Sequence, residues 1–429
     1  MRSCGATVGQ AVKPVAHYNA LLRILISAGE ASGEMYGAQL IEALRRCDPS
    51  LTFFGAGGDR MSAAGCDLII DAEDLAVVGI TEILSHLPKI LGLYKKLIRV
   101  ADDRRPALAV VIDSPAFNWR VACQMRKRGI PVVYYVCPQF WAWRQGRVKL
   151  LRKYVNKALV IFPFEEKFYR ERGVDATFVG HPLADLPAPA ITREAYAVEH
   201  VCGGHSLRLA PLAQGRLCPP LDPAKPWITL MPGSRRKEVR MNLPTILESA
   251  DRLGASYEFL LPVARTLERS FLKGLIGERS ASLFVETRPA ASPAGKIHLV
   301  PEALPALHHS RAAIVASGTA TEEAALMGTP FVMVYRVSPI TYALGKPRIK
   351  VPHYAMVNLI ADEEVVPELV QRKFTAQNIV AELNKIIPDG PPREQMLRGL
   401  ASVKEKLKKS DNNQHPADRA AEIILDMLR

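Results

Sequence analysis

The segment 22–46, LRILISAGEASGEMYGAQLIEALRR, decides the fold class. Its first eight residues are an apolar, partly β-branched run typical of a strand, and 33–46 has the apolar spacing of a helix. Gly29, Gly33 and Gly37 open the helix with the spacing G-x-x-x-G-x-x-x-G, which is neither the dinucleotide fingerprint nor a P-loop. A strand that is apolar on both faces and leads into a helix predicts a parallel sheet covered by helices. Two interpretations of these glycines are equally compatible with the sequence. They either let a ligand approach the backbone N–H groups or simply form a tight turn.

The same rhythm recurs along the chain. Further apolar runs that predict strands lie at 51–56, 108–113, 132–137, 158–164, 177–180, 227–233, 257–263, 297–301, 312–317 and 330–336. Between the halves, 182–226 contains eight prolines, which is typical of an inter-domain boundary. We therefore predict an α/β protein with two Rossmann-like doubly wound domains that face a cleft.

The predicted organisation has five parts. They are an N-terminal extension at 1–21, expected to be disordered, an N-terminal Rossmann-like domain at 22–185, a linker at 186–226 with an inserted loop near 201–220, a C-terminal Rossmann-like domain at 227–400, and C-terminal helices at 401–429. In sheets of this kind, ligands bind beyond the carboxyl ends of the strands.

Composition excludes several classes of protein. The 429 residues are 48% apolar, which suits two domains and excludes general disorder. No apolar run reaches the roughly 18 residues of a transmembrane helix, and the first twenty residues lack a run of signal-peptide length. Seven cysteines without a C-x-x-C pair argue against a zinc site and a disulfide framework, and for a reducing cytoplasm.

The positive charge is concentrated. The net charge is +13, and the segments 89–105 and 141–172 carry most of it. Solvated helix faces explain such runs most simply, but a surface that meets nucleic acid, a phosphorylated substrate or acidic lipid is also compatible with them. Two tryptophans at 141 and 143 beside the second cluster are typical of base stacking, of an interfacial anchor or of ordinary packing.

The segment 80–100 has apolar residues at helical spacing with lysines beside them. Such a stripe is more often a core face than a membrane face. We expect Pro88 to break the helix early, and cationic flanks are typical of interfacial helices. The membrane hypothesis predicts one exposed patch, made of Ile83, Leu84, Leu87, Ile90 and Leu91.

Three segments could carry chemistry. Asp113 ends an apolar strand in VIDSPAFN, where it is either a general base or, as the residues alone favour, a helix cap. In 231–239 the N–H groups and side chains suit a pyrophosphate, although a turn with an exposed basic helix also fits; the residues concerned are Gly233, Ser234 and Arg235. The stretch 316–330 is a stronger phosphate site with a carboxylate for ribose; its residues are Ser317, Gly318, Thr319 and Glu323. We find no D-x-D pair, no H-E-x-x-H set and no nucleophile elbow, so we predict neither a metal nor a cofactor.

With these motifs in order, the chain from about Arg23 onward resembles the lipid-A-disaccharide synthase family, inverting glycosyltransferases of the GT-B type. The resemblance is carried by AGEASGE (28–34), GAGGDRM (55–61), DLAVVGITEIL (74–84), VIDSPAFN (111–118), PQFWAWRQGRV (138–148), FPFEEKFY (162–169), VGHPLAD (179–185), MPGSR (231–235), ASGTATEE (316–323) and MVNLIA (356–361). The chain departs from the family pattern at Glu34, which is commonly Asp, at Ala116, commonly an acid, at Cys137, commonly a small hydroxyl residue, and at Glu322, commonly apolar.

The resemblance implies a reaction of lipopolysaccharide biosynthesis. The family transfers the sugar of UDP-2,3-diacylglucosamine to the 6-hydroxyl of 2,3-diacylglucosamine 1-phosphate, which gives the β(1→6) lipid A disaccharide 1-phosphate and UDP. It implies Asp113 as the base, Arg235 with the N–H groups at 317–319 at the diphosphate, and Glu323 at the ribose. It further implies that Asn358 orients a substrate and that Gly29, Glu30 and Gly33 border the acceptor.

The same resemblance implies partners and a location. We expect an anionic membrane surface as a partner, no nucleic acid, and a peripheral protein on the cytoplasmic face of the bacterial inner membrane; a homodimer is left open. Two other classes of function remain. One is an enzyme like the UDP-N-acetylglucosamine epimerases, which acts on a soluble UDP-sugar, and the other is a non-catalytic module that binds membrane surfaces.

Overall fold

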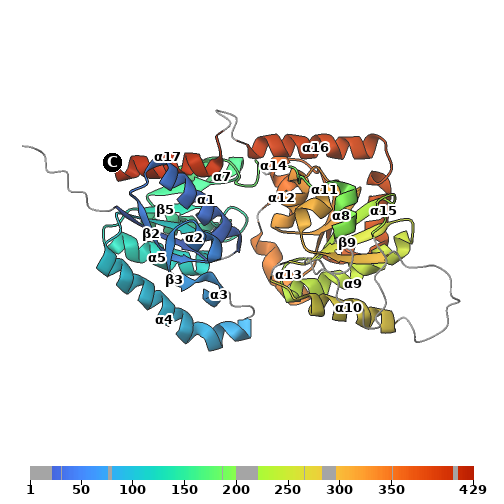
Figure 1. Ribbon diagram of the computed structural model, residues 1–429, viewed down its shortest axis with the longest axis horizontal. Helices are drawn as coiled ribbons and strands as arrows, with labels where there is room; N and C mark the ends of the chain where they lie inside the picture. Colours follow the sequence, from blue (N-terminus) through green and yellow to red (C-terminus); the bar gives the residue numbers. More distant parts are fainter. Residues whose placement is uncertain are drawn as a thin grey trace, which may run out of the picture.

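A computed structural model describes residues 22–29, 31–75, 80–185, 187–199, 221–264, 266–282, 296–349, 351–408 and 414–429. The strands within these ranges form two parallel sheets, each flanked by helices (Figure 1). The predicted fold class is therefore confirmed. The N-terminal extension 1–21 and the inserted loop 201–220 lie outside the described residues, and the exact domain bounds stay predictions.

The first sheet has seven strands in the order β3-β2-β1-β4-β5-β6-β7. Their bounds are β1 Arg23–Ala28, β2 Thr52–Gly57, β3 Cys66–Asp71, β4 Leu108–Ile112, β5 Val132–Tyr135, β6 Lys157–Val160 and β7 Ala176–Phe178. The strand order reverses between β1 and β4, which pair in parallel with Ile24 opposite Leu108. Ligands of doubly wound sheets bind at such a switch point.

The second sheet has six strands in the order β10-β9-β8-β11-β12-β13. Their bounds are β8 Trp227–Met231, β9 Glu258–Pro262, β10 Lys296–Val300, β11 Ala312–Ala316, β12 Phe331–Tyr335 and β13 Glu368–Val370. The order reverses between β8 and β11, so this sheet has a switch point of its own. Most residues of the central strands are fully buried, as sheets covered on both faces require.

Helices connect the strands and cover the sheets (Figure 1). Those of the first half are α1 Ala31–Cys47, α2 Asp59–Ala63, α3 Ala72–Leu75, α4 Ile80–Arg104, α5 Pro115–Lys127, α6 Val148–Tyr154 and α7 Pro163–Arg170. The others are α8 Arg193–Glu199, α9 Arg236–Leu253, α10 Arg269–Ser282, α11 Ala303–His309, α12 Thr319–Leu326, α13 Pro339–Gly345, α14 Met356–Ala361, α15 Ala376–Ile386, α16 Pro391–Leu407 and α17 Pro416–Leu428.

The chain crosses between the halves more than once. α8 packs on the second sheet, where Arg193 lies over the ring of Trp227 at 3.9 Å and donates to the carbonyl of His309. α16 covers the second half, and α17 returns to the first half beside α1 (Figure 1). α8 therefore belongs to the second half, and the C-terminal tail connects this half back to the first.

Two strands, β3 and β13, were not predicted. β3 is an edge strand whose residues are partly exposed, and β13 has only three residues at the other sheet's edge. Edge strands need no continuous apolar run, because one of their sides faces solvent. The apolar pattern that revealed the central strands is therefore weak at both positions.

The expectation that Pro88 breaks the helix is wrong. α4 runs without interruption from Ile80 to Arg104 and contains Pro88 in its interior. Proline removes one hydrogen bond of a helix without ending it here, and Pro88 lies exposed.

α4 buries one face in its later turns. Leu97 is fully buried there, Ile90 is half-buried against the core, and Leu91 is 45% exposed. The other three members of the predicted patch, Ile83, Leu84 and Leu87, lie on α4, but their side chains are outside the described part. The exposed patch therefore stays a prediction.

Candidate active site

The site begins at the carboxyl ends of β1 and β4, at the switch point of the first sheet. Gly29 follows β1, and Asp113 and Ser114 follow β4. A Cβ atom on Gly29 would lie 2.5 Å from the Ser114 hydroxyl oxygen, so only glycine lets the two turns approach this closely. Gly33 lies in the first turn of α1, while Glu30 falls outside the described residues.

The backbone at Asp113 is strained and firmly held. Asp113 and Ser114 have φ values of 47° and 45°, in the left-handed region that non-glycine residues avoid. The carbonyl of Asp113 accepts hydrogen bonds from the Tyr134 hydroxyl at 2.8 Å and from Nδ2 of Asn118 at 3.0 Å. Asn118 is fully buried, and its Oδ1 accepts from the Ser27 hydroxyl at 2.6 Å.

The two interpretations of Asp113, a general base and a helix cap, both concern its place after β4. Ser114, not Asp113, is the N-cap residue of α5. Asp113 instead lines a cavity of about 230 Å³. Asp113 therefore lies at the switch point beside a cavity, where ligands of such sheets bind, and its role as a base stays a prediction.

That cavity has walls from both halves of the molecule. Ser32, Tyr36, Asp113 and His181 come from the first half, and Thr319 and Glu322 come from α12 in the second. Thr319 is the first residue of α12, whose N-cap is Gly318. The first-turn N–H groups of a helix attract anions, so this wall suits a phosphate. The cavity thus brings together the predicted base and Thr319, the last residue of the predicted phosphate loop.

Buried carboxyl groups gather behind this wall. Glu322 is 3% exposed, and its Oε2 lies 3.1 Å from Nε2 of the fully buried His181. Burial, with a smaller effect from Glu322, raises the pKa of Glu323 to about 7. Burial also raises the pKa of Glu165 to about 8, although the indole N–H of Trp141 donates to Glu165 at 2.8 Å.

The second predicted phosphate loop follows β8. Gly233 has a φ of +122°, and a Cβ atom there would lie 2.8 Å from Oε2 of Glu238. The carbonyl of Ser234 accepts from the Thr266 hydroxyl at 2.6 Å, and Arg235 is the N-cap of α9. The Arg235 side chain is 63% exposed and pairs with Glu238 at 3.2 Å. β8 and β11 are neighbours, so this loop shares a sheet edge with Ser317 and Gly318, although its residues do not line the cavity.

Asn358 is fully buried on α14. Its Nδ2 donates to the carbonyl of Val366 and to Glu368, and its Oδ1 accepts from the N–H groups of Val365 and Val366, all at 2.9 Å. Glu368 in turn accepts from the backbone of Tyr354. Any effect of Asn358 on a substrate therefore passes through the segment 354–368, and its orienting role stays a prediction.

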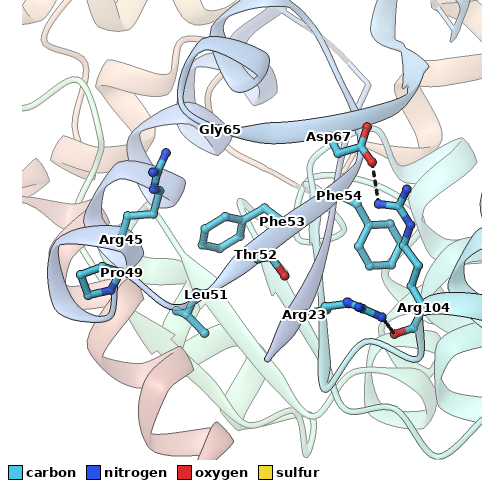
Figure 2. A pocket seen from close by; sticks show the side chains of 10 residues that line it. All are labelled: Arg23, Arg45, Pro49, Leu51, Thr52, Phe53, Phe54, Gly65, Asp67 and Arg104. Carbon is cyan, nitrogen blue, oxygen red and sulfur yellow. Dashed lines mark hydrogen bonds and ion pairs between the residues drawn. The ribbon is translucent and has the colours of Figure 1, made fainter. Parts of the chain in front are cut away.

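A larger cavity, of about 620 Å³, lies at the other end of the first sheet (Figure 2). Its three arginines already have partners: Arg23 donates to the carbonyl of Arg104, Arg45 to that of Ala64, and Arg104 pairs with Asp67 at 2.6 Å. Arg45 and Arg104 lie in the last turns of α1 and α4, where cations complement the helix dipole. This position is remote from the carboxyl ends of the strands, so we do not assign the active site to it.

The two tryptophans of the basic segment have different roles. Trp141 is 5% exposed and packs in the core, while Trp143 is 44% exposed, lines the smaller cavity and carries Arg144 over its ring at 4.3 Å. The backbone of Trp143 forms an antiparallel bridge with Ile349, which joins the two halves beside the cavity.

Sequence reasoning assigned no role to three residues of the site. Asn118 and His181 lay in quoted motifs, but neither motif shows that these polar side chains are buried. Tyr36 lines the cavity as well, and burial, then Glu322, raises its pKa well above the usual value. His181 follows the predicted strand 177–180 directly, and a polar residue at that place is the feature of the sequence that could have indicated a site residue.

The described residues contain neither a membrane-spanning helix nor a cluster of metal ligands. No described helix has the length and apolar character needed to cross a bilayer. No group of three or more metal-ligating side chains occurs in the same ranges. The four cysteines in this part of the structure, Cys47, Cys66, Cys123 and Cys137, form no disulfide with one another.

Comparison with known proteins gives a consistent result. A sequence profile of the lipid-A-disaccharide synthetase family matches residues 24–201 and 210–423. The lipid-A-disaccharide synthase of Koribacter versatilis (strain Ellin345) is 50% identical over 410 residues, which cover 95% of this chain and 99% of the relative. That of Acidobacterium capsulatum is 50% identical over 385 residues, covering 90% of this chain and 91% of the relative.

Solved structures share the fold. A UDP-GlcNAc 2-epimerase from Neisseria meningitidis has a TM-score of 0.57 at 14% identity, covering 95% of this chain and 99% of its own. A calicheamicin glycosyltransferase has a TM-score of 0.53 at 15% identity, covering 95% and 98%. At such identities the likeness shows the fold alone, so the epimerase alternative has no support beyond a distant relation of fold.

Proposed function

This chain belongs to the lipid-A-disaccharide synthase family of glycosyltransferases. From that premise we propose how the two walls of its smaller cavity carry out the transfer of a sugar from donor to acceptor. The proposed donor is UDP-2,3-diacylglucosamine and the proposed acceptor is 2,3-diacylglucosamine 1-phosphate. The observation that carries the proposal is one cavity that holds both Asp113 and the first turn of α12. It supports a base and a phosphate site on opposite walls.

In the proposed step, the acceptor binds at the first-sheet wall, near Gly29 and Gly33. Asp113 takes the proton of the acceptor 6-hydroxyl as its oxygen bonds to the anomeric carbon of the donor. The bond between that carbon and the diphosphate oxygen breaks from the opposite side, which inverts the configuration. UDP leaves with the electron pair.

The second half stabilises the departing charge. Backbone N–H groups at Gly318 and Thr319, together with Arg235, are placed at one edge of the second sheet. Oriented donors of this kind stabilise charge that develops in the transition state. Glu323, when ionised, accepts hydrogen bonds from the ribose hydroxyls of UDP.

The acyl chains of both substrates call for a membrane surface. On α4, Leu91 is exposed together with Lys95, Lys96 and Arg99. Lys89 differs from these, because it pairs with Asp74 at 2.6 Å. We place this face on the cytoplasmic leaflet of the inner membrane, where lysine and arginine meet anionic headgroups.

The direct test is an assay of the purified full chain with both diacylglucosamine substrates, followed for UDP release and for the disaccharide product. Release that requires both substrates supports the proposal. Release of UDP from a soluble UDP-sugar without an acceptor, or no release at all, contradicts it.

A further inference from the structure

His181 and Glu322 meet between the two halves of the molecule. His181 follows β7 of the first sheet, and Glu322 lies in α12 after β11 of the second. Their side chains are 0% and 3% exposed, with 3.1 Å between Nε2 and Oε2. Both line the cavity that holds Asp113, so the contact joins the wall of the base to the wall of the phosphate site.

The imidazole of His181 is held in one orientation. Its Nδ1 accepts the N–H of Leu183 at 3.2 Å, which fixes the ring plane. Nε2 lies 3.1 Å from Oε2 of Glu322, a close polar contact that does not have the geometry of a hydrogen bond. The backbone N–H of His181 donates to the carbonyl of Leu407 at the end of α16, at 3.0 Å. Arg419 of α17 donates to the carbonyl of Val179 at 3.1 Å. α16 and α17, the two helices of the C-terminal tail, therefore both hold the backbone of residues 179–181 in place.

Glu322 needs the contact more than an exposed acid would. Glu165 and Glu323 lie near enough that Glu322 contributes to their raised pKa values, and Tyr36 faces the same carboxylate. A buried carboxylate among acids is costly without a hydrogen-bonded partner. Buried polar contacts add little net stability, but a close contact between two fixed side chains favours one arrangement of the surrounding elements over others.

We propose that His181 and Glu322 are a positioning pair, which holds the Asp113 wall and the α12 wall at the spacing that transfer requires. The proposal rests on the function proposed above. Neither residue is required to touch the reacting atoms. Displacing a reacting group by about 1 Å can lower the rate by about 100-fold, so loss of the pair should act on turnover.

The chain offers a matched control. Glu258 of β9 and His298 of β10 form a second buried pair, with 2.7 Å between Oε2 and Nε2 and exposures of 0% and 10%. Both belong to the second sheet, so breaking this pair does not change the spacing between the halves. Glu258 also lies 3.6 Å from Nζ of Lys225, so Glu258→Ala removes two polar contacts within the second half and reports their effect on stability.

The experiment compares Glu322→Ala, Glu322→Gln, His181→Ala and the double alanine variant with Glu258→Ala in the full chain. It measures kcat, KM, UDP affinity, thermal stability and the distance between the halves by small-angle scattering. We expect Glu322→Ala and His181→Ala each to lower kcat about 10-fold or more. The double variant should be no worse than either single one, UDP affinity should stay within about twofold, and the distribution of distances should broaden.

The remaining variants make the inference falsifiable. Glu322→Gln keeps the length of the side chain and its polar contact with Nε2, so it should retain kcat within about threefold, and it remains informative if the alanine variant does not fold. Glu258→Ala should lower only thermal stability. The inference is overturned if Glu322→Ala behaves like Glu258→Ala, or if UDP affinity falls in proportion to kcat. If the wild type releases no UDP, the proposed function fails, while the scattering comparison still decides whether the pair sets the spacing.

Discussion

At the scale of single residues, the site is defined by constrained backbone rather than by unusual side chains. The turn of Asp113 and Ser114 has left-handed φ values, and Asn118 and Tyr134 hold it through the carbonyl of Asp113. Strain of this kind persists only where the surroundings fix it, and it is typical of functional sites.

Replacing Asp113 tests the base directly. Asp113→Asn should lower kcat by about 10²–10⁴-fold, because the amide cannot take the acceptor proton. UDP affinity and thermal stability should stay near the wild type, and Asp175→Asn, in an exposed ion pair with Lys157, is the matched control. Near-normal turnover of Asp113→Asn would reduce the aspartate to a structural role.

Glu323 should make UDP binding depend on pH. Its pKa is about 7 in the folded protein, against an ordinary value of 4.5, so it is largely protonated below pH 7. UDP affinity should rise as the pH increases through 7, because the ionised carboxylate accepts both ribose hydroxyls. In Glu323→Gln the rise of UDP affinity around pH 7 should disappear. Titration calorimetry from pH 5.5 to 8.5 measures the affinity of both proteins. A variant profile parallel to the wild type would contradict the role.

The same residue affects stability with a defined sign. The folded protein holds the Glu323 proton to a higher pH than the unfolded chain does. Its contribution to the free energy of unfolding is therefore complete below pH 4.5 and is lost as the pH rises to about 7. Denaturant titrations should therefore show the wild type losing stability relative to Glu323→Gln as the pH rises from 4.5 to about 7, because the variant stays neutral at this position.

At the scale of elements, α4 separates core from surface within one helix. Leu97 is fully buried and Leu91 is 45% exposed, although both belong to the apolar stripe of the sequence. Periodicity placed both residues on a helix but did not separate the buried member from the exposed one.

The two leucines provide a paired test of the membrane face. Leu91→Ala should weaken binding to vesicles that contain anionic lipid and leave thermal stability nearly unchanged. Leu97→Ala should cost about 2–5 kcal/mol of the free energy of unfolding, because it leaves a cavity in the core. Unchanged vesicle binding by Leu91→Ala would count against the proposal that this face meets the membrane.

At the scale of the whole molecule, the site depends on two sheets whose carboxyl edges face one cavity. The proposed stabilisation of the diphosphate uses Arg235 and the N-terminus of α12, and no metal ion. Activity should therefore survive exhaustive chelation with EDTA. Complete loss that Mg²⁺ restores would show that the diphosphate site is misassigned.

The sequence by itself determined the alternation of strands and helices, the central strands of both sheets, and the turns at Gly29, Asp113, Gly233 and Ser317. These features are local, because they depend on apolar runs and glycine spacing that act over a few residues. The edge strands β3 and β13 escaped prediction because a half-exposed strand has no such run.

Only the tertiary structure decided which residues meet. His181 and Glu322 lie far apart in the sequence, and nothing in either motif indicates that they form a buried contact at 3.1 Å. The continuity of α4 through Pro88 and the return of α17 to α1 were also decided by packing over long distances. The physical reason is that burial and cross-chain contacts depend on where all the elements lie, whereas propensity and spacing describe only neighbours along the chain.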